Sequence, residues 1–360
     1  MSRAPLQDSL SPDSPSAHTF GQHGTAVTEV CESAVGETAT GEYRAIPYAT
    51  PPSFGATDVG LIVMALIWGV NYSVVKSGIT TLEPLTFNGL RVALASIILL
   101  AIAATVRGVA LPSRREALLL AGLGLLGNGM YQLLFILGMS RTRAGIAALV
   151  IAAGPAWIAI ISRMLGLERL SRRGWSGIGL QLLGVGCVVA SAGALDADTG
   201  ALIGAALIAG GSIMWALFSV LLTPFTQKTH PLHLSAITMT SGAIFLVGIA
   251  LPGMARLDWG AVTAREWGAV AYAGIGALVI AYLLFYRGVR ILGPTRTAMY
   301  GNLQPLIALL FAWVMLHERP TLWQGVGAAF VMGGLLVSRT ARIRTALLPP
   351  RIPSPAMGRP

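Results

Sequence analysis

Charged side chains are scarce in this chain of 360 residues. Asp, Glu, Lys and Arg together make up 11% of it, hydrophobic residues make up 54%, and the mean hydropathy is +0.69. Because soluble domains carry roughly 25% charged residues, this composition excludes an ordinary soluble protein. Apolar runs of about 20 residues, long enough to cross a bilayer, recur along the chain. The composition therefore predicts an integral membrane protein with many spans.

Several chemical signatures are also missing. The two cysteines, Cys31 and Cys187, have no partners at a spacing typical of a disulfide framework or a metal site. Neither GxxxxGK[ST] nor HExxH occurs, so we expect no ATP hydrolysis by this chain, no metal and no cofactor. No Asp or Glu lies in the middle of an apolar run, which argues against a central carboxylate for proton coupling. The net charge of +10 comes from basic residues between the apolar runs, where they contact lipid headgroups rather than nucleic acid.

Ten apolar runs bounded by charges, prolines or polar turns are the predicted membrane spans, and they indicate an all-α fold. The polar segment 1–57 is predicted to be a disordered N-terminal tail, and 341–360 a short basic C-terminal tail. The ten runs lie at 58–76, 84–106, 116–138, 144–166, 174–193, 200–222, 231–252, 266–286, 294–316 and 321–339.

The basic residues between these runs predict the orientation of the chain. With the N-terminus inside, the inner loops and tails collect fourteen Lys and Arg residues, and the outer loops collect six. Cytoplasmic loops carry the excess of Lys and Arg, so this bias places both termini in the cytoplasm.

The chain contains an internal repeat. At an offset of 150, residues 131–184 align without a gap on 281–334, with ten identities that include Pro155 with Pro305 and Glu168-Arg169 with Glu318-Arg319. Nearer the start, Trp68 meets Trp215 at an offset of 147. Each copy holds five spans, at 58–193 and 199–340. Because five is odd, the second copy enters the membrane from the opposite side, which predicts two inverted five-helix repeats with a site near the midplane.

These residues resemble the EamA family of the drug/metabolite transporter superfamily. The resemblance rests on IWGVNYSVVKSGI at 67–79, PLTFNGLR at 84–91, the segments GPAWIAIISRMLGLERL and QPLIALLFAWVMLHERP, and the glycine-rich spans after each of the two. It covers essentially 58–340. It implies a carrier, often an exporter, of amino acids or similar small metabolites in a bacterial inner membrane. It does not name the solute, and it leaves a monomer and a homodimer open.

Two prolines and one arginine stand out in the spans. Pro155 and Pro305 interrupt apolar helices at corresponding places, which indicates either a lined cavity and hinge or a packing kink. Arg91 lies about seven residues into the second run, where a cation is a candidate ligand for an anion. Its alternatives are snorkelling to headgroups or pairing with Glu83. The pairs Glu168-Arg169 and Glu318-Arg319 fix helix ends or gate the carrier.

Polar and aromatic residues within the spans are the candidate lining of a substrate pocket. Trp68, Asn71 and Tyr72 share one helix face, as Asn88 and Arg91 do. The alternatives are membrane-interface belts and interhelical hydrogen bonds. The remaining candidates are Tyr131, Gln132, Trp157, Trp215, Tyr282, Tyr300, Asn302 and Gln304.

The leading interpretation is a secondary carrier working by alternating access, and three other classes of protein compete with it. A major-facilitator-type carrier is disfavoured by ten spans in an odd-numbered repeat. A polytopic membrane enzyme such as a lipid-modifying transferase needs a His/Asp or nucleophile constellation, and none is evident, so no catalytic residue is predicted. A signalling or scaffold protein does not need Arg91 or paired prolines.

Overall fold

The computed structural model describes residues 35–37, 43–45, 55–106, 111–166, 168–169, 171–196, 199–301, 303–340 and 344–345. The chain divides into two compact units, one made of Met1–Pro52 with Leu347–Pro360 and the other of Ser53–Ala346. In the first unit, β1 (Val35–Glu37) and β2 (Tyr43–Ala45) pair antiparallel within the tail that was predicted to be disordered.

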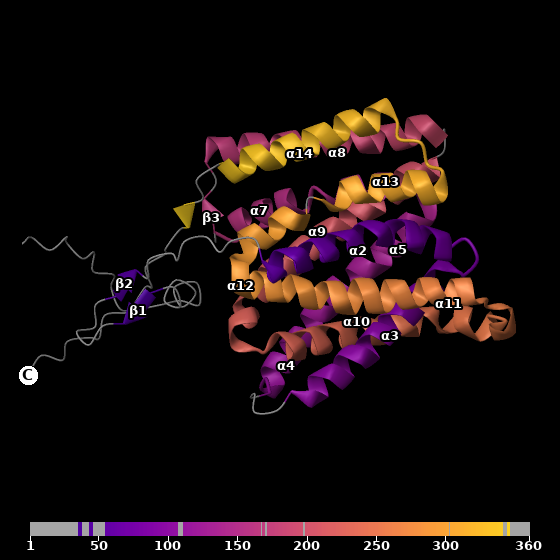
Figure 1. Cartoon of the computed structure of the whole chain (residues 1–360), viewed down its shortest axis with the longest axis horizontal. Helices are drawn as coiled ribbons and strands as arrows, with labels where there is room; N and C mark the ends of the chain where they lie inside the picture. The colour runs from indigo at the N-terminus through magenta and orange to yellow at the C-terminus, as the bar shows by residue number, and fades with distance from the viewer. Residues whose placement is uncertain are drawn as a thin grey trace, which may run out of the picture. The chain divides into compact units, whose positions relative to one another are not determined.

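The second unit is a bundle of helices (Figure 1). Its helices begin where the sequence supplies helix-start chemistry. The Asp58 carboxylate accepts a hydrogen bond from the Gly55 N–H at the start of the first helix, and a proline occupies the first turn of the second. The elements of its first half are α2 (Ala56–Gly78), α3 (Pro84–Thr105), α4 (Arg114–Gly124), η1 (Leu125–Met130), α5 (Tyr131–Arg141), α6 (Ala144–Ile151), α7 (Gly154–Met164), β3 (Glu168–Arg169) and α8 (Arg172–Asp196).

The second half resembles the first, except that one helix, α12, stands where the first half has α5 and α6, and its strand follows the last helix instead of preceding it. It adds a short 3₁₀ turn, η2, before its third span, and its last strand, β4, pairs antiparallel with β3. Its elements are α9 (Thr199–Lys228), α10 (Pro231–Arg256), η2 (Trp259–Ala261), α11 (Ala264–Ala271), η3 (Tyr272–Ile280), α12 (Ala281–Gly301), α13 (Gln304–Leu316), α14 (Leu322–Thr340) and β4 (Arg344–Thr345).

Seven helical runs of the described chain are long and apolar enough to cross a membrane, and two shorter apolar helices lie at Gln304–Leu316 and Leu322–Val337. The prediction of a helical membrane protein is confirmed, with four strands of two or three residues added to it among the described residues. The count of ten spans stays a prediction. Helix α12 departs from the predicted boundaries: it continues to Gly301, through the break predicted between 266–286 and 294–316, and Figure 1 shows it turning from the layer of α11 toward α13.

The helices of the two halves pack in matched pairs. The last spans α8 and α14 lie side by side, and so do the second spans α3 and α10 (Figure 1). The third span of each half packs on the first span of the other, as α5 on α9 and α12 on α2. The fourth spans do the same, as α7 on α9 and α13 on α2. Each of these contacts therefore has an equivalent contact when the two halves are interchanged, as in an approximate twofold symmetry.

Glycines allow the closest of these approaches. A Cβ atom on Gly124 would clash with the backbone of Thr238, and one on Gly127 would clash with the ring of Phe218. A Cβ atom on Gly274 would lie 2.8 Å from the Arg91 carbonyl oxygen. The glycines thus bring the third spans against α9, α10 and α3, as small residues do in membrane helix packing.

Candidate functional site

Arg91 lies in the second turn of α3 and is 1% exposed. Its Nε donates to Asn88 Oδ1 at 2.9 Å, and one terminal nitrogen donates to Gln132 Oε1 at 2.7 Å. The Asn88 side-chain amide in turn donates to the Gln132 backbone carbonyl at 3.2 Å. These three side chains, the arginine network, join α3 to α5. The structure shows no ion pair between Arg91 and Glu83, whose carboxylate accepts from Thr86, and the burial of Arg91 argues against snorkelling.

The arginine network contains a charge but only neutral acceptors. Both acceptors of the guanidinium among the described residues are amide oxygens. Burying a cation inside a membrane protein is costly, and neutral hydrogen bonds offset only part of that cost. The guanidinium also lies over the Phe135 ring, with 5.5 Å from its carbon to the ring centroid. The site therefore retains an excess positive charge that an anion would neutralise.

Aromatic rings extend from this charge across the boundary between the two halves. Phe135 contacts Tyr72 and Tyr131, each at 6.0 Å between centroids, and Tyr131 contacts Trp215 at 5.3 Å. The rings continue from Trp215 to Tyr282 at 6.0 Å and from Tyr282 to Trp68 at 5.8 Å. These six residues are the aromatic cluster, and they come from α2, α5, α9 and α12. The structure thus brings together eight of the thirteen predicted lining residues: Trp68, Tyr72, Asn88, Arg91, Tyr131, Gln132, Trp215 and Tyr282.

Two π-helices position the third spans at this cluster. The segment η1 ends at Met130, immediately before Tyr131 and Gln132, and η3 ends at Ile280, just before Tyr282. Trp68 Nε1 donates to the Ala277 carbonyl within η3 at 2.9 Å. π-helical turns are rare and occur often at functional sites. They were not predicted, and the only sequence signal was the local density of glycine.

The two prolines begin helices rather than interrupt them. Pro155 lies in the first turn of α7, after α6 ends at Ile151, and Pro305 lies in the first turn of α13. The prediction of a mid-helix proline is therefore corrected to a discontinuous helix, because proline is well tolerated where the amide hydrogen has no helical partner. Pro305 is buried and Pro155 is exposed.

The remaining predicted lining residues have other surroundings. Tyr300 donates through its hydroxyl to Asp58 Oδ1 at 2.5 Å, near the start of α2. The Gln304 carbonyl lies beside Gly69, where a Cβ atom would be 3.2 Å from it. Asn71 is 8% exposed, and its Oδ1 has no hydrogen-bond partner among the described residues. Trp157, in α7, is half-buried outside the aromatic cluster, and Asn302 lies outside the described residues.

The two Glu-Arg pairs differ in what surrounds them. Glu168 and Arg169 form strand β3 instead of a helix end, and their side chains lie outside the described residues. Glu318 follows α13, and its two carboxylate oxygens accept from the backbone N–H groups of Ala144 and Gly145 in the first half. Arg319 is exposed.

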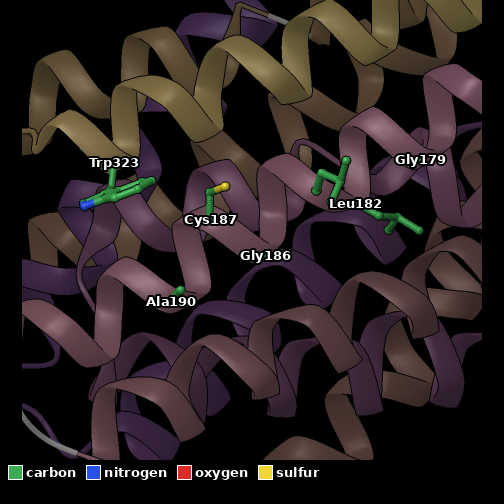
Figure 2. A pocket seen from close by; sticks show the side chains of 7 residues that line it. Gly179, Leu182, Gly186, Cys187, Ala190 and Trp323 are labelled. Atoms are coloured by element: carbon green, nitrogen blue, oxygen red, sulfur yellow. The ribbon is translucent and has the colours of Figure 1, made fainter.

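Two surface hollows lie away from the aromatic cluster. One, of about 430 Å³, is lined by Glu83, Gly253, Arg256 and Leu257. The other, of about 860 Å³, is an apolar groove along α8, and Figure 2 shows Trp323 above Cys187 and Ala190 on its wall. No group of three His, Cys, Asp or Glu residues suited to a metal occurs in the described part of the chain.

A multi-pass helical membrane protein with two matched halves and a buried cation between them is the class that this fold and site define. The sequence profile of the EamA-like transporter family matches it twice, over residues 56–190 and 202–340. The chain belongs to that family and is a membrane transporter, as the resemblance implied, consistent with the drug/metabolite transporter superfamily.

Curated relatives agree with this assignment. The chain is 30% identical over 263 residues to the uncharacterized inner membrane transporter YedA of Escherichia coli, covering 72% of this chain and 81% of YedA. It is 24% identical to the uncharacterized transporter YyaM of Bacillus subtilis over 280 residues, covering 77% and 92% of the two chains. A solved crystal structure with 21% identity covers 80% of this chain and 99% of its own, with a TM-score of 0.55, and shares the fold.

Proposed function

We propose that this protein is a secondary transporter that exports small metabolites, such as amino acids or related amphipathic or anionic compounds, by alternating access. The observation that carries the proposal is the buried Arg91: among the described residues neutral side chains hold it, and it lies over Phe135, one ring of an aromatic cluster that draws on both halves. Membership of the EamA-like family supports a transporter of that type instead of the major-facilitator type, and the names of the relatives point to transport rather than to an enzyme.

The chemistry of the site suggests how a solute binds. A carboxylate that accepts hydrogen bonds from the guanidinium neutralises the excess charge, which is a charge-assisted interaction. The apolar part of the same solute packs on rings such as Trp68 and Tyr282, which supply large contact area. Access requires movement, because Arg91 is 1% exposed and Tyr72 and Tyr282 are each 6% exposed.

The proposed arrangement is two inverted repeats of five spans in the inner membrane, with both termini in the cytoplasm. The matched packing of α8 with α14 and of α3 with α10 supports a pseudo-twofold relation between the halves. The discontinuous helices near Pro155 and Pro305 are typical of such carriers. Reporter fusions at each terminus test the orientation, and an external C-terminus would contradict an even number of spans.

The function is tested by a metabolite screen in cells that overexpress the chain. We expect one or more carboxylate-bearing solutes to accumulate outside cells with the wild-type protein and not with Arg91→Ala. Arg256→Ala is the matched control, since Arg256 is exposed and donates to the Pro252 carbonyl of its own helix. If no solute changes its distribution in the wild type, the carrier proposal fails. If export survives Arg91→Ala, the anion site fails and the carrier proposal stands.

A further inference from the structure

Glu318 reaches from the second half of the chain to a helix of the first. Helix α13 ends at Leu316 and is followed by His317, whose φ of 55° lies in the left-handed region, and the Glu318 N–H returns to the Ala312 carbonyl at 3.1 Å. This tight turn directs the half-buried Glu318 carboxylate at α6. One oxygen accepts from the Ala144 N–H at 3.1 Å and the other accepts from the Gly145 N–H at 3.2 Å.

The start of α6 has no side-chain cap from its own segment. The residue before it is Arg143, whose side chain accepts no capping hydrogen bond. The first N–H groups of a helix lack helical partners and carry partial positive charge, so a carboxylate there is favourable. Here that carboxylate lies 174 residues further along the chain. The cap is therefore a contact between the two halves.

The neighbouring helix end is held by a cation. Lys76, in the last turn of α2, donates through Nζ to the carbonyls of Met139 and Thr142, at 2.7 Å each, at the end of α5. Carbonyls at a helix C-terminus favour a positive charge. The two-residue turn between α5 and α6 is thus held on one side by Lys76 and on the other by Glu318.

We propose that Glu318 is a releasable latch: it holds α6 to the end of α13 while this end of the bundle is closed, and it leaves α6 when this end opens. The inference rests on the proposed function, because only an alternating-access carrier needs this end to open. In the repeat alignment the position of Ala144 is taken by Pro294, which has no amide hydrogen. A cap with two N–H donors therefore cannot form at the corresponding place in the other copy.

The cap is tested by amide hydrogen exchange of the full chain in lipid nanodiscs. In Glu318→Gln the side chain keeps its size and loses its charge. We expect the amides of residues 144–147 to exchange about tenfold faster, which corresponds to about 1.4 kcal/mol. Arg319→Gln, a change at the exposed neighbour, is expected to leave them as in the wild type. Unchanged exchange in Glu318→Gln, or equal acceleration in Arg319→Gln, would overturn the cap.

The release is tested by labelling the thiol of an Ala148→Cys variant, at a position in α6 that is 2% exposed. In a Cys31→Ser, Cys187→Ser background, an impermeant maleimide is added from outside the cell, because the predicted topology places the connections 139–143 and 317–320 on the outer side. We expect slow labelling with Glu318 intact, about tenfold faster labelling with Glu318→Gln, and no change with Arg319→Gln. Equal rates in all three would overturn the latch. Neither experiment needs a substrate, so a failed latch leaves the carrier proposal standing, while a failed metabolite screen removes the carrier itself.

Discussion

Replacing Gln132 by glutamate places a carboxylate directly against Arg91, because Gln132 Oε1 lies 2.7 Å from a guanidinium nitrogen and the two side chains have the same shape. The attraction between charges about 4 Å apart is about 4 kcal/mol at an effective dielectric constant of about 20. Dehydrating the new carboxylate costs several kcal/mol, so we expect the melting temperature in detergent to change little. The guanidinium would, however, already be neutralised.

A solute carboxylate entering Gln132→Glu therefore meets a neutral pair instead of a cation. A loss of about 2.7 kcal/mol of this attraction lowers the affinity for the solute about 100-fold. The affinity is measured by isothermal titration with an anionic solute found in the screen. Gln132→Leu is the control: it removes one acceptor from the buried cation and lowers stability by about 1–3 kcal/mol, while the charge of the site is kept. Wild-type affinity in Gln132→Glu would refute the reasoning that Arg91 binds the anion.

Three further predictions concern stability, each measured by thermal unfolding in detergent. Gly124→Ala is expected to lower the stability by about 1–3 kcal/mol through a clash with α10. Gly122→Ala, at a position with open space around it, should be neutral or stabilising by up to about 1 kcal/mol. Equal effects of the two substitutions would contradict the packing. Trp68→Phe keeps a ring but loses the bond to the Ala277 carbonyl, at a cost of about 1 kcal/mol, and no loss would mean that the bond contributes nothing. His317→Gly should stabilise the left-handed turn by up to about 1 kcal/mol and His317→Val should destabilise it, and the reverse order would contradict this turn.

The sequence predicted the class of protein and selected many of the residues that the structure brings together around Arg91. A buried cation, amides and aromatic rings are unusual in apolar spans, so Arg91, Asn88 and Trp68 could be selected individually. The internal repeat identified Trp215 as the counterpart of Trp68. Because polar groups inside a membrane must find partners, residues of this kind tend to meet, as Arg91 and Gln132 do.

Other features depend on geometry that a linear pattern does not contain. A π-helical turn adds one residue per turn without a residue type of its own, so η1 and η3 had no distinct signal. A proline in an apolar run is compatible with a kink or with a new helix, and only the backbone distinguishes the two at Pro305. The contact of Glu318 with α6 joins segments 174 residues apart, and the nearby Arg319 made a local charge pair the simpler interpretation.

The most direct test of the central claim is transport by the purified protein in liposomes. A labelled carboxylate-bearing solute from the screen is exchanged against unlabelled solute inside the vesicles. We predict uptake with the wild type and with Arg256→Ala. With Arg91→Ala we predict uptake no higher than in empty liposomes, although thermal unfolding shows that this variant is folded. Wild-type uptake by folded Arg91→Ala would contradict a substrate site at the arginine network.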